Sequence, residues 1–407
     1  MATPMDYGAA GDGSTNDYAA LLAALQSGNV IDGLGKTYAL DQGLVVSSNF
    51  RGFHNATLKW RTSAGMVRHE HLLRVQNLSD WFVDRLNFDL GNERYSNGYG
   101  DNLRGGFVST RTDNNANSRN EHFRVTNCTV WGFGSGTGIE IRWGSKGVVA
   151  NNIVRDRQAF WRADGLNLSG VNGNYTGMND IQNGIQIDRC ECMTVANNVV
   201  HSLLNTVDQN THPRWSRGLC VTSTRDSAFT GNSFSFVDQA MDFSGGPNIV
   251  GSDGLGGNVN NTIDANVIVD VTTYGIKLAN VTRDCIISDN SIRRFGLSGI
   301  VLSGGEGITT AQMTQRNTIQ NNYVLEPLPN SLGACVPIRC MASSNTAYPR
   351  DNLFTANRVN GNNACSNGFH SDVSLSSGNQ WQINRVNNVN GADYAGSGIS
   401  SANYKVL

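Results

Sequence analysis

The stretch TIDANVIVDVTTYGIKLANVTRDCIISDNSI (262–292) contains one full turn of a repeat. Its first seven and its last seven residues follow one template, in which apolar residues, small polar residues, an asparagine and further apolar residues come in that order. Asparagine tolerates the left-handed backbone of a tight bend, and stacked identical amides hydrogen-bond from layer to layer. One residue type returning at one corner of every coil is what a parallel β-solenoid needs.

The same template covers most of the chain. RVTNCTV (124–130) contributes Asn127 to the series. The other aligned asparagines are Asn152, Asn198, Asn232, Asn266, Asn290, Asn322, Asn357 and Asn384. We expect these side chains to lie over one another, one in each coil.

Short strands of the form glycine–apolar–any residue–apolar precede these asparagines. Gly138 lies 14 residues before Asn152. Ala240 lies 26 residues before Asn266, and the extra residues coincide with the glycine-rich stretch 244–258, which we interpret as a loop inserted in one coil. Such a strand points two side chains inward and one outward, so the outward residues should form columns with about 4.8 Å between strands.

The composition agrees with a single solenoid domain. The 407 residues include 46 glycines, 7 prolines and 16% charged residues, and helix signal is nearly absent after residue 30. A solenoid core grows lengthwise, so one domain can hold this length. We expect a lead-in with a capping helix at 1–40, a parallel β-helix at 41–385 and a C-terminal tail or cap at 386–407.

Charge and hydropathy argue against several classes of partner. The net charge is −2 without a basic cluster, which disfavours nucleic acid. No apolar run approaches the ~18 residues that a membrane-spanning helix needs. The segment MATPMDYGAAGDG (1–13) lacks the basic and apolar parts of a Sec signal peptide. We therefore expect neither nucleic acid nor membrane as a partner.

The eight cysteines fit no zinc pattern, because the one Cys-x-Cys pair, Cys190 and Cys192, has no second pair or histidine cluster near it. Most cysteines fall in or beside predicted strands, where a free thiol behaves as a small hydrophobic group. We expect buried free thiols and assembly in a reducing cytoplasm. We expect no metal and no other cofactor, since the clustered carboxylates that calcium requires are also missing from the sequence.

The segment DYGAAGDGSTNDYAALLAAL (6–25) resembles the opening of pectate-lyase-like β-helix proteins, including many phage tailspikes. The resemblance implies a right-handed, single-stranded parallel β-helix, an all-β fold with a short N-terminal capping α-helix. Asn16 or Asp17 can cap this helix, and one helix face combines Tyr18, Leu21, Leu22 and Leu25. That face would cover the open end of the solenoid. Asp6, Asp12 and Asp17 are therefore interpreted as structural residues.

Candidate functional residues come from the outward columns of the glycine-led strands and from the long segments between coils. The columns carry acids and cations in the middle coils and turn to Ser298, Val301 and Ser303 later. Exposed aromatic rings can stack on sugars, and cations bind acidic sugars. Our catalytic candidates are Glu140, Asp188 and Asp242. Our substrate-binding candidates are Arg142, Trp161, Gln186, Trp215, Arg217 and Lys277.

Mechanistic alternatives stay open. Inverting hydrolysis needs carboxyl groups roughly 6.5–9.5 Å apart. Glu140 and Asp188 would be about 8 Å apart if their coils are neighbours, and about 12 Å apart if residues 163–169 form a coil between them. The pair Asp188 and Asp242 would also lie near 12 Å.

A lyase would instead need a base such as Lys277 or His212, with Arg217 as the neutralising cation for a uronic acid. The segment NGFHSD (367–372) distantly resembles the active-site motif of mannuronan epimerases.

The residues and the resemblance together favour a phage tailspike that binds and cleaves a host capsule or lipopolysaccharide, with hydrolysis favoured over elimination. The resemblance implies a homotrimer in the virion tail, made in the host cytoplasm and attached through its first residues or a tail adaptor protein. One alternative is a spike that binds a receptor or extends the tail without cleaving anything. Another is a secreted, extracellular carbohydrate enzyme of cellular origin.

Overall fold

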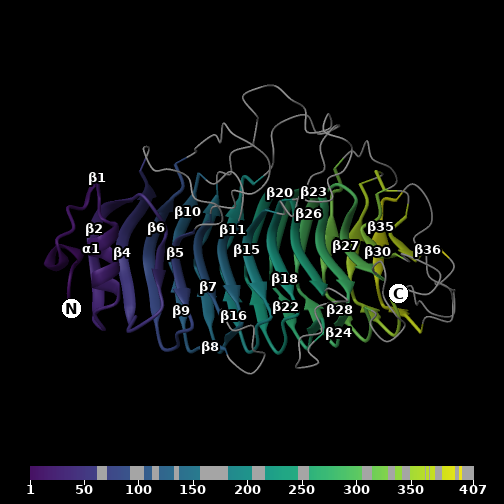
Figure 1. Ribbon diagram of the computed structural model, residues 1–407. Coiled ribbons are helices and arrows are strands. Elements are labelled where there is room, and N and C mark those ends of the chain that lie inside the picture. Colours follow the sequence, from purple (N-terminus) through teal and green to yellow (C-terminus); the bar gives the residue numbers. More distant parts are fainter. Residues whose placement is uncertain are drawn as a thin grey trace, which may run out of the picture. The chain divides into compact units, whose positions relative to one another are not determined.

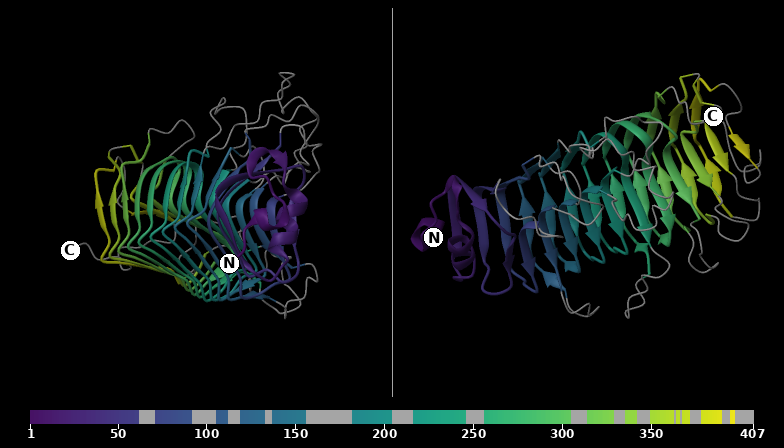
Figure 2. Two further views of the ribbon diagram at one scale, coloured as in Figure 1. Left: turned by 90° about the vertical axis from the view of Figure 1, so that its left-hand side faces the viewer. Right: turned by 45° about the horizontal axis from the view of Figure 1, so that its top comes forward.

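The computed structural model describes residues 1–61, 71–91, 105–111, 119–132, 137–155, 182–203, 216–245, 256–304, 314–328, 335–341, 349–362, 364–365, 367–371, 378–389 and 394–396. The chain divides into two compact units. Unit 1 comprises Met1–Gln186 and Asn198–Arg217, and unit 2 comprises Ile187–Asn197 and Gly218–Leu407. In each unit parallel strands stack coil upon coil (Figures 1 and 2), which confirms the predicted right-handed parallel β-helix.

Each complete coil contributes one strand to each of three walls, named A, B and C in chain order. In unit 1, wall A contains β3 (Leu44–Val46), β5 (His71–Gln76), β7 (Gly105–Thr110) and β11 (Thr137–Arg142). Walls B and C contain the first and second halves of β4 (Gly52–Trp60) and β6 (Phe82–Asp89). Wall B continues in β9 (Arg124–Thr126) and β13 (Val148–Ala150), and wall C in β10 (Thr129–Trp131), β14 (Ile153–Arg155) and β17 (Val199–His201).

Unit 2 repeats this pattern. Its wall A contains the second halves of β20 (Ser233–Gly245) and β23 (Val267–Asn280), then β27 (Ser298–Ser303), β30 (Ile338–Met341), β33 (Phe369–Ser371) and β36 (Tyr394–Gly396). Wall B contains β16 (Thr194–Ala196), β19 (Ala228–Thr230), β22 (Thr262–Asp264), β25 (Ile286–Ser288), β28 (Thr318–Gln320), β31 (Leu353–Thr355) and β34 (Gln380–Gln382). Wall C contains the first halves of β20 and β23, then β26 (Ser291–Phe295), β29 (Tyr323–Leu325), β32 (Arg358–Asn360) and β35 (Arg385–Asn387).

Four further elements complete the strand list. β15 (Gln182–Asp188) and β18 (Ser216–Thr222) each have residues in both units. β8 (Asn120–Glu121) pairs with β12 (Gly144–Ser145), and β21 (Asn258–Val259) pairs with β24 (Thr282–Arg283).

The N-terminal segment caps the first coil of unit 1. A 3₁₀ helix (Pro4–Tyr7) and β1 (Asp12–Asn16) precede helix α1 (Tyr18–Leu25), which buries Leu21, Ala24 and Leu25. The predicted face is therefore partly wrong, because Tyr18 and Leu22 are only half-buried. β2 (Val30–Leu40) already pairs with β4, so coil structure begins before residue 41.

The three aspartates of this segment hold its turns together. Asp6 accepts from the backbone N–H of Thr3. Asp12 accepts from the backbone N–H groups of Ser14 and Thr15. Asp17 stands at the N-cap of α1, yet its carboxylate accepts from the N–H groups of Ala10 and Gly11. Asn16 accepts from the helix residue Tyr18.

The predicted asparagine ladder is present within each unit. In unit 1, Asn152 donates its side-chain amide to the Oδ1 of Asn198. In unit 2 the ladder runs through Asn232, Asn266, Asn290, Asn322, Asn357 and Asn384. The Nδ2–Oδ1 distances are 2.9–3.0 Å, and every member is buried. Each of these bonds thus satisfies a buried donor in one coil and a buried acceptor in the next.

Two details of the ladder correct the sequence analysis. The left-handed residue of the bend is the one before each ladder asparagine, and it includes Ala265 (φ 53°) and Ile383 (φ 53°). Asn127 belongs to this bend position (φ 56°), so its predicted place in the ladder is wrong. Cys128 stands there instead, and its backbone N–H donates to Asn152. The ladder asparagine is selected for its hydrogen bonds rather than for left-handed backbone.

A second column of side-chain hydrogen bonds lies five residues earlier, where each coil enters wall B. Asn317, Asn352 and Asn379 form a shorter amide ladder there, and the backbone N–H of Cys285 donates to Asn317. In the preceding coils Met193 donates its N–H to Ser227 Oγ, and Ser227 donates its N–H to Asn261. The sequence analysis missed this column because its residue type varies.

The glycines that open the wall A strands allow a close approach. A Cβ added at Gly138 would lie 2.6 Å from the carbonyl oxygen of Gly184 and 2.7 Å from a methyl of Val154. A Cβ at Gly275 would lie 2.5 Å from the carbonyl oxygen of Gly299 and 2.8 Å from Ile292. Real Cβ atoms are not found at such distances, so the glycine–apolar pattern reflects packing against the next coil and the core.

Apolar side chains fill the space between the walls. Phe354 and Trp381 stack with ring centroids 3.9 Å apart in unit 2, and Trp81 and Phe123 stack at 4.9 Å in unit 1. Seven of the eight cysteines are buried and Cys192 is exposed. Cys335 and Cys365 place their sulfur atoms 3.0 Å apart.

Candidate functional site on wall A

The outward residues of wall A form one column in each unit. In unit 1 the column runs Arg74, Val108, Glu140 on β5, β7 and β11. In unit 2 it runs Asp242, Lys277, Val301, Arg339, His370 on β20, β23, β27, β30 and β33. The interior residues beside them, such as Ile139 and Ile276, are fully buried. The wall therefore carries charged side chains on an apolar support.

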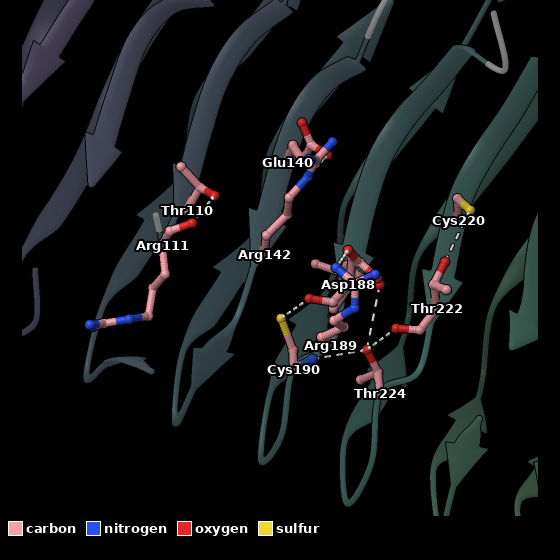
Figure 3. A network of polar contacts seen from close by, with 11 residues as sticks. Thr110, Arg111, Glu140, Arg142, Asp188, Arg189, Cys190, Cys220, Thr222 and Thr224 are labelled. Atoms are coloured by element: carbon pink, nitrogen blue, oxygen red, sulfur yellow. Dashed lines mark hydrogen bonds and ion pairs between the residues drawn. The ribbon is translucent and has the colours of Figure 1, made fainter. Parts of the chain in front are cut away.

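Glu140 is an outward residue whose side chain is only 4% exposed. Its carboxylate accepts from Nε of Arg142, two residues along β11 (Figure 3). Its Oε2 also lies 3.6 Å from Nε2 of His71. A buried carboxylate needs such partners, because desolvation of an isolated charge is costly. The structure thus brings together the candidates Glu140 and Arg142, and it adds His71, which the sequence analysis did not select.

His71 reaches Glu140 across β7 because Gly105 has no side chain. His71 and Gly105 are register partners on β5 and β7. A Cβ at Gly105 would lie 2.3 Å from Cδ2 of His71. The imidazole occupies the space that any other residue at position 105 would fill.

The remaining described unit 1 candidates lie on β15 and β18. Gln186 is half-buried and accepts through its Oε1 from the side-chain amide of the buried Asn183, at 2.9 Å. Arg217 is half-buried at the start of β18. Both retain enough exposure to contact a ligand.

Asp188 belongs to unit 2, and its side chain is 9% exposed. Its carboxylate lies 3.2 Å from an Nη of Arg189, the next residue (Figure 3). The same close-up shows Cys190 against Thr224, where the backbone N–H of Cys190 donates to the hydroxyl oxygen. Asp188 therefore lies beside a bend whose residues are held by hydrogen bonds.

Asp242 is fully buried, although it points outward from wall A. The hydroxyl of Ser244 donates to its Oδ1, and Nζ of Lys277 lies 3.8 Å from its Oδ2. The Lys277 side chain is 23% exposed. Asp242 and Lys277 thus form an ion pair in which the lysine is accessible to a ligand and the aspartate is buried.

The spacing of coils decides part of the geometry that the sequence left open. β14 pairs directly with β17, and Gly138 approaches Gly184, so the coils that begin at these glycines are neighbours. Residues 163–169, for which the sequence left an intervening coil open as an alternative, lie outside the described residues. In unit 2 one coil separates Asp188 from Asp242, because Arg189 donates its N–H to Thr222 and Gly218 lies against Ala240.

Trp161, Trp215 and His212 also lie outside the described residues, as does Asp372 of the NGFHSD segment.

We expected the outward residues of wall A to be small and uncharged in the later coils, and this expectation is wrong. The column includes Val301 as expected, yet the next two coils contribute Arg339 and His370. Their strands open with Pro337 and Gly368 and depart from the glycine–apolar–any–apolar pattern, which explains why they escaped detection. His370 comes from the NGFHSD segment.

Tyr274 adds a phenol beside this column. In wall A, Tyr274 pairs with Gln239 of β20 on one side and with Ser298 of β27 on the other. Burial raises the pKa of Tyr274, nearby Arg339 opposes the rise and Asp238 adds to it. Asp238 is fully buried and accepts from the hydroxyl of Thr272. The phenol is therefore a hydrogen-bond donor at neutral pH.

Among the described residues, no group of three histidine, cysteine, aspartate or glutamate side chains is placed to hold a metal ion. The helical part of the described structure contains no segment with the length and apolar character of a membrane span.

No protein-family model matches the chain, and no curated protein matches it. Several solved structures have a similar fold. The A-module of mannuronan C-5 epimerase AlgE4 from Azotobacter vinelandii superposes with a TM-score of 0.64 at 17% identity, covering 100% of both chains. The AlgE6 A-module from the same organism gives 0.65 at 17% identity, covering 99% of this chain and 97% of that one.

The tailspike of Escherichia coli bacteriophage HK620 gives a TM-score of 0.66 at 12% identity, covering 94% of this chain and 64% of the tailspike. That tailspike structure is a glutamate variant in complex with a hexasaccharide. At these identities the likeness concerns the fold. Together with the parallel walls, it places the chain among the right-handed parallel β-helix proteins.

Proposed function

We propose that this β-helix protein binds and cleaves a polysaccharide on wall A, with Glu140 as a catalytic carboxylate. The observation that carries the proposal is the state of Glu140, an outward side chain that is buried against an arginine and a histidine. Glutamate is almost never this buried unless it is paired. Structural neighbours that act on a polysaccharide or hold an oligosaccharide support the same function.

Hydrolysis is the reaction we favour. Water adds across the glycosidic bond, so that its hydroxyl joins the anomeric carbon and a proton goes to the leaving oxygen. Two carboxyl groups share these proton transfers in most glycosidases. Glu140 in unit 1 is our candidate for one such group, and Asp188 and Asp242 are the candidates in unit 2. Arg142, Gln186, Arg217 and Lys277 are proposed to contact the sugar.

The biological setting we propose is a phage tailspike that acts on host capsule or lipopolysaccharide. A homotrimer, a tail adaptor protein and a place in the virion tail belong to this proposal. They are supported by the N-terminal resemblance and by the tailspike among the structural neighbours.

The test is incubation of the protein with purified capsules and lipopolysaccharides, followed by assays for new reducing ends and for the ultraviolet absorbance of an unsaturated sugar. Hydrolysis gives reducing ends alone, and elimination gives both signals. Glu140→Gln should lower product formation by about 100-fold or more. The control Asp84→Asn changes a wall B carboxylate of unit 1 that is also paired with an arginine, and it should retain activity. Equal activity of the Glu140 variant and the wild type would refute the assignment.

Binding without cleavage is the second candidate. It is favoured by Asp242, whose carboxylate is fully buried and already engaged by Ser244 and Lys277. Stable binding of a polysaccharide that yields neither product would establish this alternative.

A further inference from the structure

We propose that the outward column of wall A in unit 2 binds the carboxylate groups of a uronic-acid polysaccharide through Lys277, Arg339 and His370. This proposal rests on the proposed function and names the class of its substrate. None of the catalytic or substrate-binding candidates chosen from the sequence lies beyond Lys277 in this column, and His370 belongs to the NGFHSD segment, so Arg339 and His370 extend the surface past those candidates.

The strand register places the three side chains in one line. Lys277 pairs with Val301, Val301 with Arg339, and Arg339 with His370. Lys277 and Arg339 are therefore two strand spacings apart, about 9.6 Å, and Arg339 and His370 are one spacing apart, about 4.8 Å. The line runs across the strands, along the direction in which coils stack. A linear polymer can follow it, whereas a single small anion would contact only one position.

The chemistry of the column favours an acidic sugar. Arg339 and His370 are half-buried, and Lys277 is 23% exposed. Within this stretch of the column Asp242 is the one acid, and it stands at the end beside Lys277. A guanidinium binds a planar carboxylate through two parallel hydrogen bonds, and a half-buried ammonium supplies a point charge. The column therefore offers more positive than negative charge to a ligand.

Tyr274 strengthens the preference for a sugar. Its phenol lies within electrostatic range of Arg339. It stands three residues before Lys277 in β23, and burial keeps it protonated at neutral pH. A phenol donor on the same wall as the guanidinium can add a hydrogen bond to a sugar hydroxyl. Val301 between the two cations is 1% exposed, so the contacts with the polymer fall to Lys277 and Arg339 on either side of it.

The experiment is affinity electrophoresis of the full chain in gels that contain a polyuronate. The matched probe is the same polymer after chemical reduction of its carboxyl groups to alcohols. We expect the polyuronate to retard the wild type and the reduced polymer to leave it unretarded. Arg339→Gln should weaken retardation about 10-fold, and Arg339→Lys should restore part of it. Arg293→Gln, at an exposed outward arginine on wall C of the same unit, should have no effect.

Three results would overturn the inference. The first is that the reduced polymer retards the wild type as strongly as the polyuronate does. The second is that the Arg339→Gln and Arg293→Gln variants are retarded equally. The third is that dextran sulfate binds as strongly as the polyuronate, which would show that the surface recognises negative charge alone. Melting curves of both arginine variants verify that each is folded. Failure here is distinguishable from failure of the proposed function, because product formation that depends on Glu140 can persist without any role for Arg339. Retardation that depends on Arg339 can likewise persist without product.

Discussion

Nε2 of His71 lies 3.6 Å from Oε2 of Glu140, although strand β7 separates the strands that carry them. The contact exists because Gly105 leaves space over β7. A position with no side chain therefore helps to hold the candidate catalytic carboxylate. Glu140 is otherwise held by Arg142 of its own strand.

Gly105→Ala should lower polysaccharide turnover about 10-fold with a smaller change in KM, because the new methyl would displace His71 and also press on the carbonyl oxygen of Thr137, which opens the strand of Glu140. His71→Gln should produce a similar loss. Steady-state kinetics on the substrate found in the cleavage assay provide the measurement. His54→Gln is the matched control, since His54 also lies near a carboxylate, that of Asp32, at 3.9 Å. A turnover loss in the His54 variant as large as in the His71 variant would point to a general loss of stability.

Asn290→Ala should destabilise the protein by about 3 kcal/mol. The substitution deprives Asn266 of its acceptor and leaves the carbonyl of Ile263 without the amide that donates to it. Chemical denaturation followed by circular dichroism measures the change. Asn387→Ala alters an exposed asparagine in β35 and should shift stability by less than about 0.5 kcal/mol. Similar effects of the two substitutions would mean that the buried ladder contributes little.

Ile383→Asn should stabilise the chain by about 1 kcal/mol. Ile383 has a φ of 53° and is 47% exposed, so a branched side chain is strained there and little burial is lost. The comparison is Ile286→Asn, which changes an equally exposed isoleucine in the extended strand β25. Thermal midpoints should rise for the first variant alone, and a fall for Ile383→Asn would contradict the argument.

Asp12→Asn should destabilise the protein at neutral pH, with the difference from wild type shrinking in acid. The backbone N–H groups of Thr15 and Ser14 and the Thr15 hydroxyl hold the pKa of Asp12 well below its usual range. A carboxyl whose folded-state pKa is depressed stabilises the folded state above its unfolded pKa, about 4, and loses this contribution as pH falls further. Melting temperatures of both proteins from neutral to strongly acidic pH test this, and a constant difference would disprove it.

Native protein should react rapidly with a water-soluble thiol reagent at one cysteine, Cys192, since the other seven are buried. Burial raises the pKa of Cys128 and that of Cys285 to about 12, which keeps both in the unreactive thiol form. Titration before and after unfolding counts the groups. Cys192→Ser should abolish the fast phase, and several fast equivalents in that variant would show that the core opens.

The fold could be predicted from the sequence because the ladder asparagines keep one identity from Asn152 to Asn384. The left-handed position before them varies among asparagine, aspartate, glycine, alanine and isoleucine, so the bend could not be assigned to the right residue. Residue identity shows hydrogen bonding more clearly than it shows backbone conformation.

The candidate site was only partly predictable. Glu140 and Arg142 share one strand, and their contact follows from strand periodicity. His71 lies about seventy residues earlier in a strand without the glycine signature, and its contact depends on a missing side chain in a third strand. Arg339 and His370 lie in strands whose opening residues differ from the repeat. Contacts that join separate coils require the register, which the sequence alone leaves open.

The five amide-to-amide hydrogen bonds of the unit 2 ladder all donate in the same sense, from Asn232 toward Asn384. Their dipoles therefore add head to tail, and each amide polarises the next. Such a chain of hydrogen bonds has a direction, which runs with the sequence from Asn232 to Asn384. A coil can take part in this chain only if its ladder residue accepts from the amide before it and donates to the amide after it, and asparagine does both with one side chain.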